Sequence, residues 1–190
     1  FKPFEASFVD KKKYGDCKAL SNYTQACLDA VGIKSHQALI NAAYNKEPVD
    51  PSFPANNFNH VILCVPLAKD SVWLECTSNT NEFGVLGSFT ENRNALLITG
   101  DGGKLVATPR SIAANNQFKT NCTITLREDG SGNVKVNLLT KGEFNNPFLM
   151  SEKKDEQKKY LVNTLGFLQP DDFLFTEDKT GNVSSQVEME

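Results

Sequence analysis

Two short apolar runs, separated by a six-residue connection, most strongly constrain how this chain can fold. Residues 60–65 are apolar after the first position, and residues 72–77 form the second run after the connection at 66–71. A nearly continuous apolar run of this length is typical of a central strand covered on both faces. The short connection predicts that the two runs pair as an antiparallel hairpin.

This hairpin places a histidine and a carboxylate near each other. His60 begins the first run, and Glu75 lies inside the second, where a charged side chain is unusual unless it is paired or exposed. Directly opposed residues of an antiparallel pair share one face. His60 opposes Glu75 if the hairpin centre falls between Leu67 and Ala68, and a later centre makes the two residues diagonal. Both registers remain open, and both keep Glu75 near the imidazole.

A helix is predicted over residues 17–31, directly after a turn that contains Gly15. Asp16 is suited to cap its first turn, and Gly32 stands where a left-handed C-terminal cap is expected. Cys17 therefore occupies the first turn. Apolar and weakly polar residues recur at three- and four-residue spacing and predict one buried face, formed by Leu20, Tyr23, Thr24, Cys27, Leu28 and Val31.

These elements predict cysteine-dependent chemistry at Cys17, His60 and Glu75. Unpaired N–H groups at a helix start stabilise a thiolate, a nearby imidazole can take the thiol proton, and a carboxylate can orient the imidazole. Each residue also has a simpler interpretation. Cys17 could be a small buried residue, His60 a hydrogen-bonded histidine at a strand start, and Glu75 an exposed edge residue. The three together, in this order and on these elements, favour the catalytic interpretation.

The rest of the chain predicts an α+β protein with two domains, residues 1–110 and 117–190. Apolar periodicity disappears over residues 109–116, which marks the boundary. In the first domain, strands are expected at 35–42, 95–99 and 105–108, with a loop rich in Pro, Asn and Asp at 45–57. The second domain is expected to be β-rich, with a hairpin formed by residues 118–127 and 134–140. One helix is expected near 151–165, where Ser151 begins it and Gly166 ends it. A strand at 173–175 and a polar, mobile end are expected to follow.

Composition excludes several classes of function. The net charge of −3 offers no electrostatic basis for binding nucleic acid or an anionic membrane, and no run of about 18 apolar residues could span a bilayer. Five cysteines without a C-x-x-C pair, with only two histidines, make a zinc site improbable. The cysteines other than Cys17 are interpreted as structural. The predicted thiol chemistry needs no metal or organic cofactor.

Several segments, in order, resemble the transglutaminase-like superfamily in its bacterial, multidomain form. The similar segments are residues 14–23 around Cys17, Gly32 with Ile33, residues 58–62 around His60, residues 73–78 around Glu75, and residues 83–97. The resemblance covers roughly residues 1–108. It implies a papain-like core, in which a helix carrying Cys17 packs on an antiparallel sheet carrying His60 and Glu75, followed by a smaller β-rich domain.

The resemblance also implies a function. It implies acyl transfer to an amine, or hydrolysis of peptide or isopeptide bonds, on protein or peptide substrates in the periplasm, at the cell envelope or outside the cell. Hydrolysis is slightly favoured, and a catalytically silent binding or scaffold module is the alternative. The chain departs from the family pattern in having Glu75 where Asp is usual. It also has no Gln or Trp in residues 1–14 to serve as an oxyanion donor, so this donor is expected before Phe1, in a longer protein.

Overall fold

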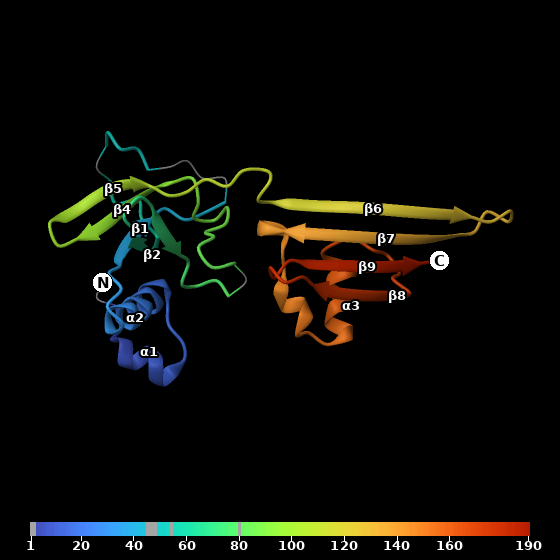
Figure 1. Cartoon of the computed structure of the whole chain (residues 1–190), viewed down its shortest axis with the longest axis horizontal. Helices are drawn as coiled ribbons and strands as arrows, with labels where there is room; N and C mark the ends of the chain where they lie inside the picture. The colour runs from blue at the N-terminus through green and yellow to red at the C-terminus, as the bar shows by residue number, and fades with distance from the viewer. Residues whose placement is uncertain (1–2, 45–48, 54, 80) are drawn as a thin grey trace. The chain divides into compact units, whose positions relative to one another are not determined.

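The chain forms two units, residues Phe1–Ser111 and Ile112–Glu190. The computed structural model describes residues 3–44, 49–53, 55–79 and 81–190 (Figure 1). The predicted loop at 45–57 therefore lies partly outside the described residues. Each unit contains helices and an antiparallel sheet, so the α+β class predicted from the sequence is confirmed. None of the helices in the described part of the chain is long and apolar enough to cross a membrane.

The first unit is built on an antiparallel sheet with the strand order β3-β2-β1-β4-β5. The predicted central strand is confirmed, because β2 pairs with β1 on one side and β3 on the other. Ile62 and Leu63 are fully buried on its two faces. The strands are β1 (His36–Ile40), β2 (His60–Pro66), β3 (Ser71–Leu74), β4 (Asn94–Thr99) and β5 (Gly102–Ala107).

One face of this sheet is covered by helix α2 (Cys17–Ala30). The helix runs beside β2, because Ser21 Oγ donates a hydrogen bond to the Val61 carbonyl (3.1 Å) and Gln25 contacts Gln37 of β1 (3.2 Å). As predicted, Asp16 caps the helix by accepting a hydrogen bond from the Ala19 backbone N–H (2.9 Å). Gly32 has the expected positive φ of 78° after its end.

The predicted buried stripe of α2 is wrong in part, because Cys27 and Val31 are exposed and the fully buried residues are Ala19 and Ser21. A helix that was not expected, α1 (Ala6–Lys12), packs on α2. Helix α2 is thus held between α1 and the sheet, and buries two of its sides. Small side chains allow this close approach, whereas a search for large apolar residues overlooks them.

The opposite face of the sheet carries the main hydrophobic core of the first unit. Its side chains alternate with those that face α2, as the two-residue period of strands requires. Leu86, from the segment between β3 and β4, packs into the same cluster. The buried residues of this core are Ala38, Ile40, Ala42, Ile62, Cys64, Trp73, Leu86 and Ala95.

The second unit has a four-stranded antiparallel sheet with the order β6-β7-β9-β8. The expected hairpin is present as β6 (Gln117–Leu126) and β7 (Gly132–Lys141). Helix α3 (Lys154–Asn163) begins three residues after the predicted start, because Ser151 instead ends the short 3₁₀ helix η2 (Pro147–Met150), which follows η1 (Gly142–Phe144). Leu161 of α3 is fully buried in the core of this unit.

The expectation of a mobile C-terminal end is wrong. After β8 (Asp172–Glu177), residues Val183–Met189 form β9, which lies between β7 and β8 in the sheet. Val183 and Val187 point into the core, and Ser185 between them is also buried. Because serines interrupt the apolar alternation along the strand, the sequence of this segment looks polar although one face of the strand is buried.

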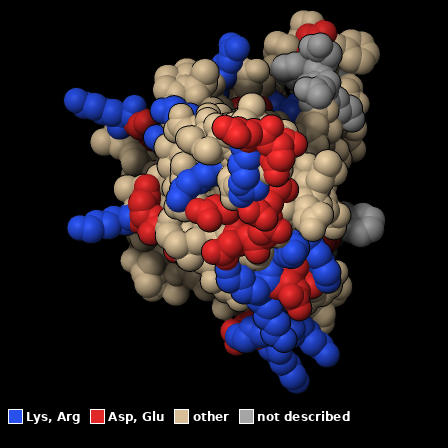
Figure 2. All heavy atoms as spheres, turned by 90° about the vertical axis from the view of Figure 1, so that its right-hand side faces the viewer, with Lys and Arg blue, Asp and Glu red and all other residues tan. Residues whose placement is uncertain are grey.

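The end of the second unit carries side chains of both signs. Figure 2 shows acidic and basic residues side by side on this face. The second unit contains two exposed ion pairs, Arg127 with Glu190 (2.9 Å) and Lys135 with Glu188 (3.0 Å). Exposed pairs of this kind stabilise a fold by about 1 kcal/mol or less.

Candidate active site

His60 and Glu75 are in direct contact in the first unit, as the hairpin predicted. His60 Nε2 lies 3.0 Å from both Oε1 and Oε2 of Glu75. Their side chains are only 10% and 5% exposed, so the pair is shielded from water. The register resolves the two alternatives. Leu63 pairs with Leu74, which places the hairpin centre beyond Ala68 and makes His60 and Glu75 diagonal neighbours.

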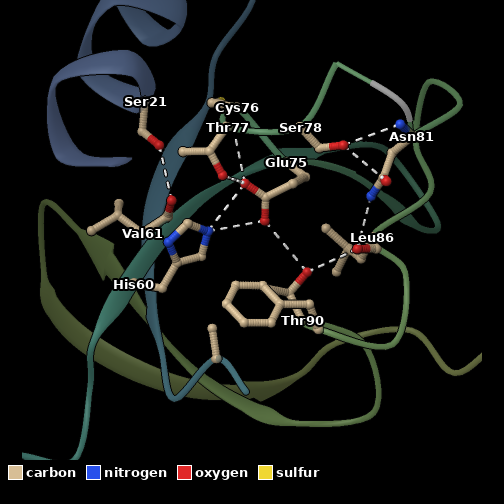
Figure 3. Close-up of polar contacts among 12 residues, drawn as sticks. Ser21, His60, Val61, Glu75, Cys76, Thr77, Ser78, Asn81, Leu86 and Thr90 are labelled. Carbon is tan, nitrogen blue, oxygen red and sulfur yellow. Dashed lines mark hydrogen bonds and ion pairs between the residues drawn. The ribbon is translucent and has the colours of Figure 1, made fainter. Parts of the chain in front are cut away.

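The Glu75 carboxylate is held on several sides (Figure 3). Thr77 donates to Oε1 from its backbone N–H (3.0 Å) and its hydroxyl (2.6 Å). The hydroxyl of Thr90 lies 3.5 Å from Oε2 and 3.0 Å from the Leu86 carbonyl. Burial opposes ionisation of Glu75, but the hydrogen bonds from His60 and Thr77 outweigh it and lower the pKa of the carboxyl below its ordinary value. Glu75 is therefore an ionised, fixed acceptor.

This arrangement defines the roles of the two ring nitrogens of His60. Since the carboxylate accepts at Nε2, that nitrogen carries a proton, and Nδ1 is the ring position that can take one. The ring also packs edge-on against Phe89, with centroids 5.7 Å apart. The imidazole is therefore oriented by an acid and an aromatic side chain, as a general base requires.

Cys17 is the first residue of α2. No hydrogen bond joins the Cys17 thiol to His60 among the residues that the structure describes. His60 shares the core face with Ile62, whereas α2 packs on the other face. Along the helix, however, Cys17 lies four residues before Ser21, a rise of about 6 Å, and Ser21 contacts Val61. Because Gln25 contacts Gln37, the register partner of Leu63, the start of α2 lies toward the N-terminal end of β2.

The other cysteines have no hydrogen bond to the His60–Glu75 pair in the part of the chain that the structure describes. Cys64 is buried, as expected of a residue in a central strand, and burial raises the pKa of its thiol. Cys76 contacts Thr24 and Ser21 of α2, away from His60, and burial likewise raises the pKa of its thiol. Cys27 and Cys122 are exposed, so the structural interpretation does not fit them. No group of three metal-ligating side chains occurs in the described ranges.

Sequence reasoning missed two residues of this site. Thr77 follows Glu75 by two positions, and a hydroxyl at that spacing can bond back to a carboxylate. Thr90 is fully buried in the segment between β3 and β4, and no local pattern distinguishes it from a loop threonine. Only the folding of that segment over the sheet brings Thr90 to Glu75.

Comparisons of the chain with protein-family models, curated proteins and solved structures found no match.

The lowered pKa of Glu75 predicts a pH-dependent contribution to stability. The carboxylate stabilises the folded state above the ordinary pKa of a glutamate, and this contribution is lost as the pH falls through the lowered value. We therefore expect Glu75→Gln to reduce the free energy of unfolding most at neutral pH and progressively less in acid. Urea unfolding at several pH values measures this difference. Glu82→Gln, at an exposed position, should show no such trend.

Proposed function

We propose that this chain is a cysteine-dependent enzyme of the transglutaminase-like, papain-like kind that acts on amide bonds of proteins or peptides. The observation that carries the proposal is the buried His60–Glu75 pair, which leaves Nδ1 of His60 as the available base. An ionised carboxylate with 5% side-chain exposure has a high desolvation cost, which a purely structural position rarely requires.

In the proposed reaction, His60 Nδ1 takes the thiol proton of Cys17, and the thiolate attacks the substrate carbonyl carbon. The resulting oxyanion lies near the Cys17 backbone N–H, in the first helical turn, where N–H groups have no intrahelical partner. His60 returns its proton to the leaving amine as the C–N bond breaks, which leaves a thioester. Water then releases an acid, or a second amine forms a new amide. Glu75 keeps the imidazole oriented throughout.

The proposal requires the Cys17 thiol to approach Nδ1 around the start of β2. Ser21, one turn after Cys17, contacts Val61, and His60 precedes Val61 as the first residue of the strand. Catalytic hydrogen bonds are often long or unformed without substrate. Hydrolysis is favoured over transfer, because water needs no binding site of its own at the thioester, whereas an amine does.

The relative alkylation rates of three cysteines test the proposal in one reaction. Cys27 and Cys122 are exposed and Cys17 is half-buried, so ordinary thiol reactivity predicts that Cys17 reacts most slowly with iodoacetamide. We expect the opposite order near neutral pH, with Cys17 at least about tenfold faster, and His60→Ala should remove most of this advantage, because the imidazole takes the thiol proton. Mass spectrometry of the digested protein gives each rate.

The same experiment addresses the second candidate, a binding or scaffold module at the cell envelope that keeps the fold without turnover. The missing hydrogen bond between Cys17 and His60 favours this candidate. Under this alternative, Cys17 reacts more slowly than Cys27 and Cys122, and His60→Ala changes nothing. That result would exclude the enzyme.

A further inference from the structure

Strand β6 forms an edge of the sheet in the second unit. Among the residues that the structure describes, β6 pairs with β7 and with no other strand (Figure 1). The 10 residues of β6 pair with β7 in an unbroken register, from Gln117 with Lys141 to Leu126 with Gly132, so the strand has no bulge. A long, regular edge of this kind presents a row of unpaired backbone N–H and C=O groups to another strand.

The hydrogen bonds at the hairpin turn show which residues of β6 point these backbone groups outward. The Arg127 N–H donates to the Ser131 carbonyl (2.8 Å), so Arg127 bonds toward the β7 side of the hairpin. In an antiparallel ladder, successive residues alternate between bonding to one neighbouring strand and pointing away from it. Counting back from Arg127, the residues that point to the free edge are the even-numbered ones, namely Phe118, Thr120, Cys122, Ile124 and Leu126.

The side chains of these five residues form an exposed, mainly apolar strip. They lie on the core face of the sheet, since Cys122 is paired with the buried Val136, and directly opposed residues share a face. The core cluster contains residues of α3, β7, β8 and β9, and none of β6. Ile124 is 61% exposed and Leu126 76% exposed, and Phe118 and Cys122 are exposed as well. Burying such side chains against a partner is favourable in proportion to the apolar area removed from water.

The other edge of this sheet is protected against pairing, whereas β6 is not. Strand β8 is 6 residues long and has an acidic residue at each end, Asp172 and Glu177. The Phe173 carbonyl of β8 also accepts a hydrogen bond from Lys154 Nζ. Short length, charged side chains and occupied backbone groups all discourage the addition of another strand. Strand β6 is longer, contains no proline, and has Lys119 as its one charged residue.

We propose that β6 pairs antiparallel with β6 of a second copy of this chain, about a twofold axis, and joins the two sheets into one. In the proposed register, Cys122 of each copy lies opposite Cys122 of the other. Phe118 then meets Leu126 of the second copy, and Thr120 meets Ile124, so every outward-pointing residue of β6 is paired. A shift of two residues in either direction leaves Phe118 or Leu126 beyond the end of the opposite strand.

The occupant is a second copy because the edge is complementary to itself in this register. The twofold axis keeps the apolar strips of both copies on one face, and the large apolar side chains at the two ends of the strand, Phe118 and Leu126, meet each other. Lys119 lies opposite Thr125 of the second copy, so the two lysines, which would repel each other if directly opposed, lie apart. All of these residues belong to the second unit, so the pairing does not depend on the chemistry proposed at Cys17.

Sedimentation equilibrium of the whole chain under reducing conditions tests the pairing. We expect the mass to rise with protein concentration from 21.0 kDa toward twice that value. Thr120→Pro removes an outward N–H at an edge position, where proline is tolerated, and should weaken the dimer at least about tenfold, because one hydrogen bond is lost from each copy. Thr120→Ala keeps this N–H and should stay within about threefold of the unaltered protein. Circular dichroism checks that both variants fold.

Oxidative crosslinking gives a second measurement, which needs no proline. Opposed residues of a hydrogen-bonded antiparallel pair have Cα atoms about 5.5 Å apart, a distance that a disulfide bridges. Diamide, which accepts the two electrons and two protons of a pair of thiols, should convert the dimer to a Cys122–Cys122 disulfide, identified by mass spectrometry. Cys122→Ser should abolish this product, and Cys27→Ser, at the other exposed cysteine, should leave it unchanged.

Three results would overturn the proposal. The first is a mass that stays at 21.0 kDa up to about 1 mM protein, because β6 then has no affinity for a second copy. The second is a dimer that Thr120→Pro leaves intact, because its interface then lies elsewhere. The third is a Cys122–Cys122 crosslink that forms equally fast in the Thr120→Pro protein, which indicates random collision of exposed thiols.

Discussion

Replacing His60 by Ala should reduce turnover by about 10²–10⁴-fold, the usual contribution of a general base. The substitution removes Nδ1 as the proton acceptor for Cys17 and leaves the Glu75 carboxylate without its main partner. Two assays with casein measure the loss, release of labelled peptides for hydrolysis and incorporation of a fluorescent amine for acyl transfer. Their ratio in the unaltered protein also shows which of the two reactions dominates.

The chain offers a matched control for this experiment. It has two histidines, and His36 of β1 is half-buried and is not among the described hydrogen-bond partners of Glu75. His36→Ala should leave both rates within about twofold. If His60→Ala retained turnover similar to that of His36→Ala, His60 would have no catalytic role.

The largest effect on stability is expected in the second unit. Leu161→Ala should lower the free energy of unfolding by about 2–5 kcal/mol, because it leaves a cavity beneath the sheet. Leu161 is fully buried and is the buried residue of α3, where it packs in a cluster with Val187 and Phe173. Urea unfolding followed by circular dichroism measures the change, and amide hydrogen exchange in β7 and β9 locates it.

A second leucine controls for the loss of side-chain volume. Leu168 is 94% exposed, so Leu168→Ala should change the free energy of unfolding by no more than about 0.5 kcal/mol. Equal effects of the two substitutions would mean that α3 does not pack on the sheet as described.

Local patterns were sufficient for the elements whose signals lie within a few residues. Helix α2 was predicted with its Asp16 cap and its Gly32 terminus, since both depend on backbone geometry at one position. The β6–β7 hairpin was predicted because its strands alternate around a glycine-rich turn. The same approach failed for β9, where Ser185 occupies a buried position between two valines.

The candidate site likewise has features that local patterns predict and features that they do not. The apolar hairpin was enough to predict that Glu75 reaches His60, since either register keeps the two side chains on one face. The sequence could not predict which register forms, because that depends on the connection between the strands. It also could not predict Thr90, which comes to the carboxylate only through the packing of a segment distant from β2.

By itself, the sequence determined the α+β class, the hairpin that pairs His60 with Glu75, and the helix that begins at Cys17. These follow from local periodicity and caps, which act over a few residues. Only the tertiary structure decided that α2 packs on the face opposite His60 and that two threonines secure Glu75. Such features depend on contacts between segments far apart in the chain, and no local pattern encodes those contacts.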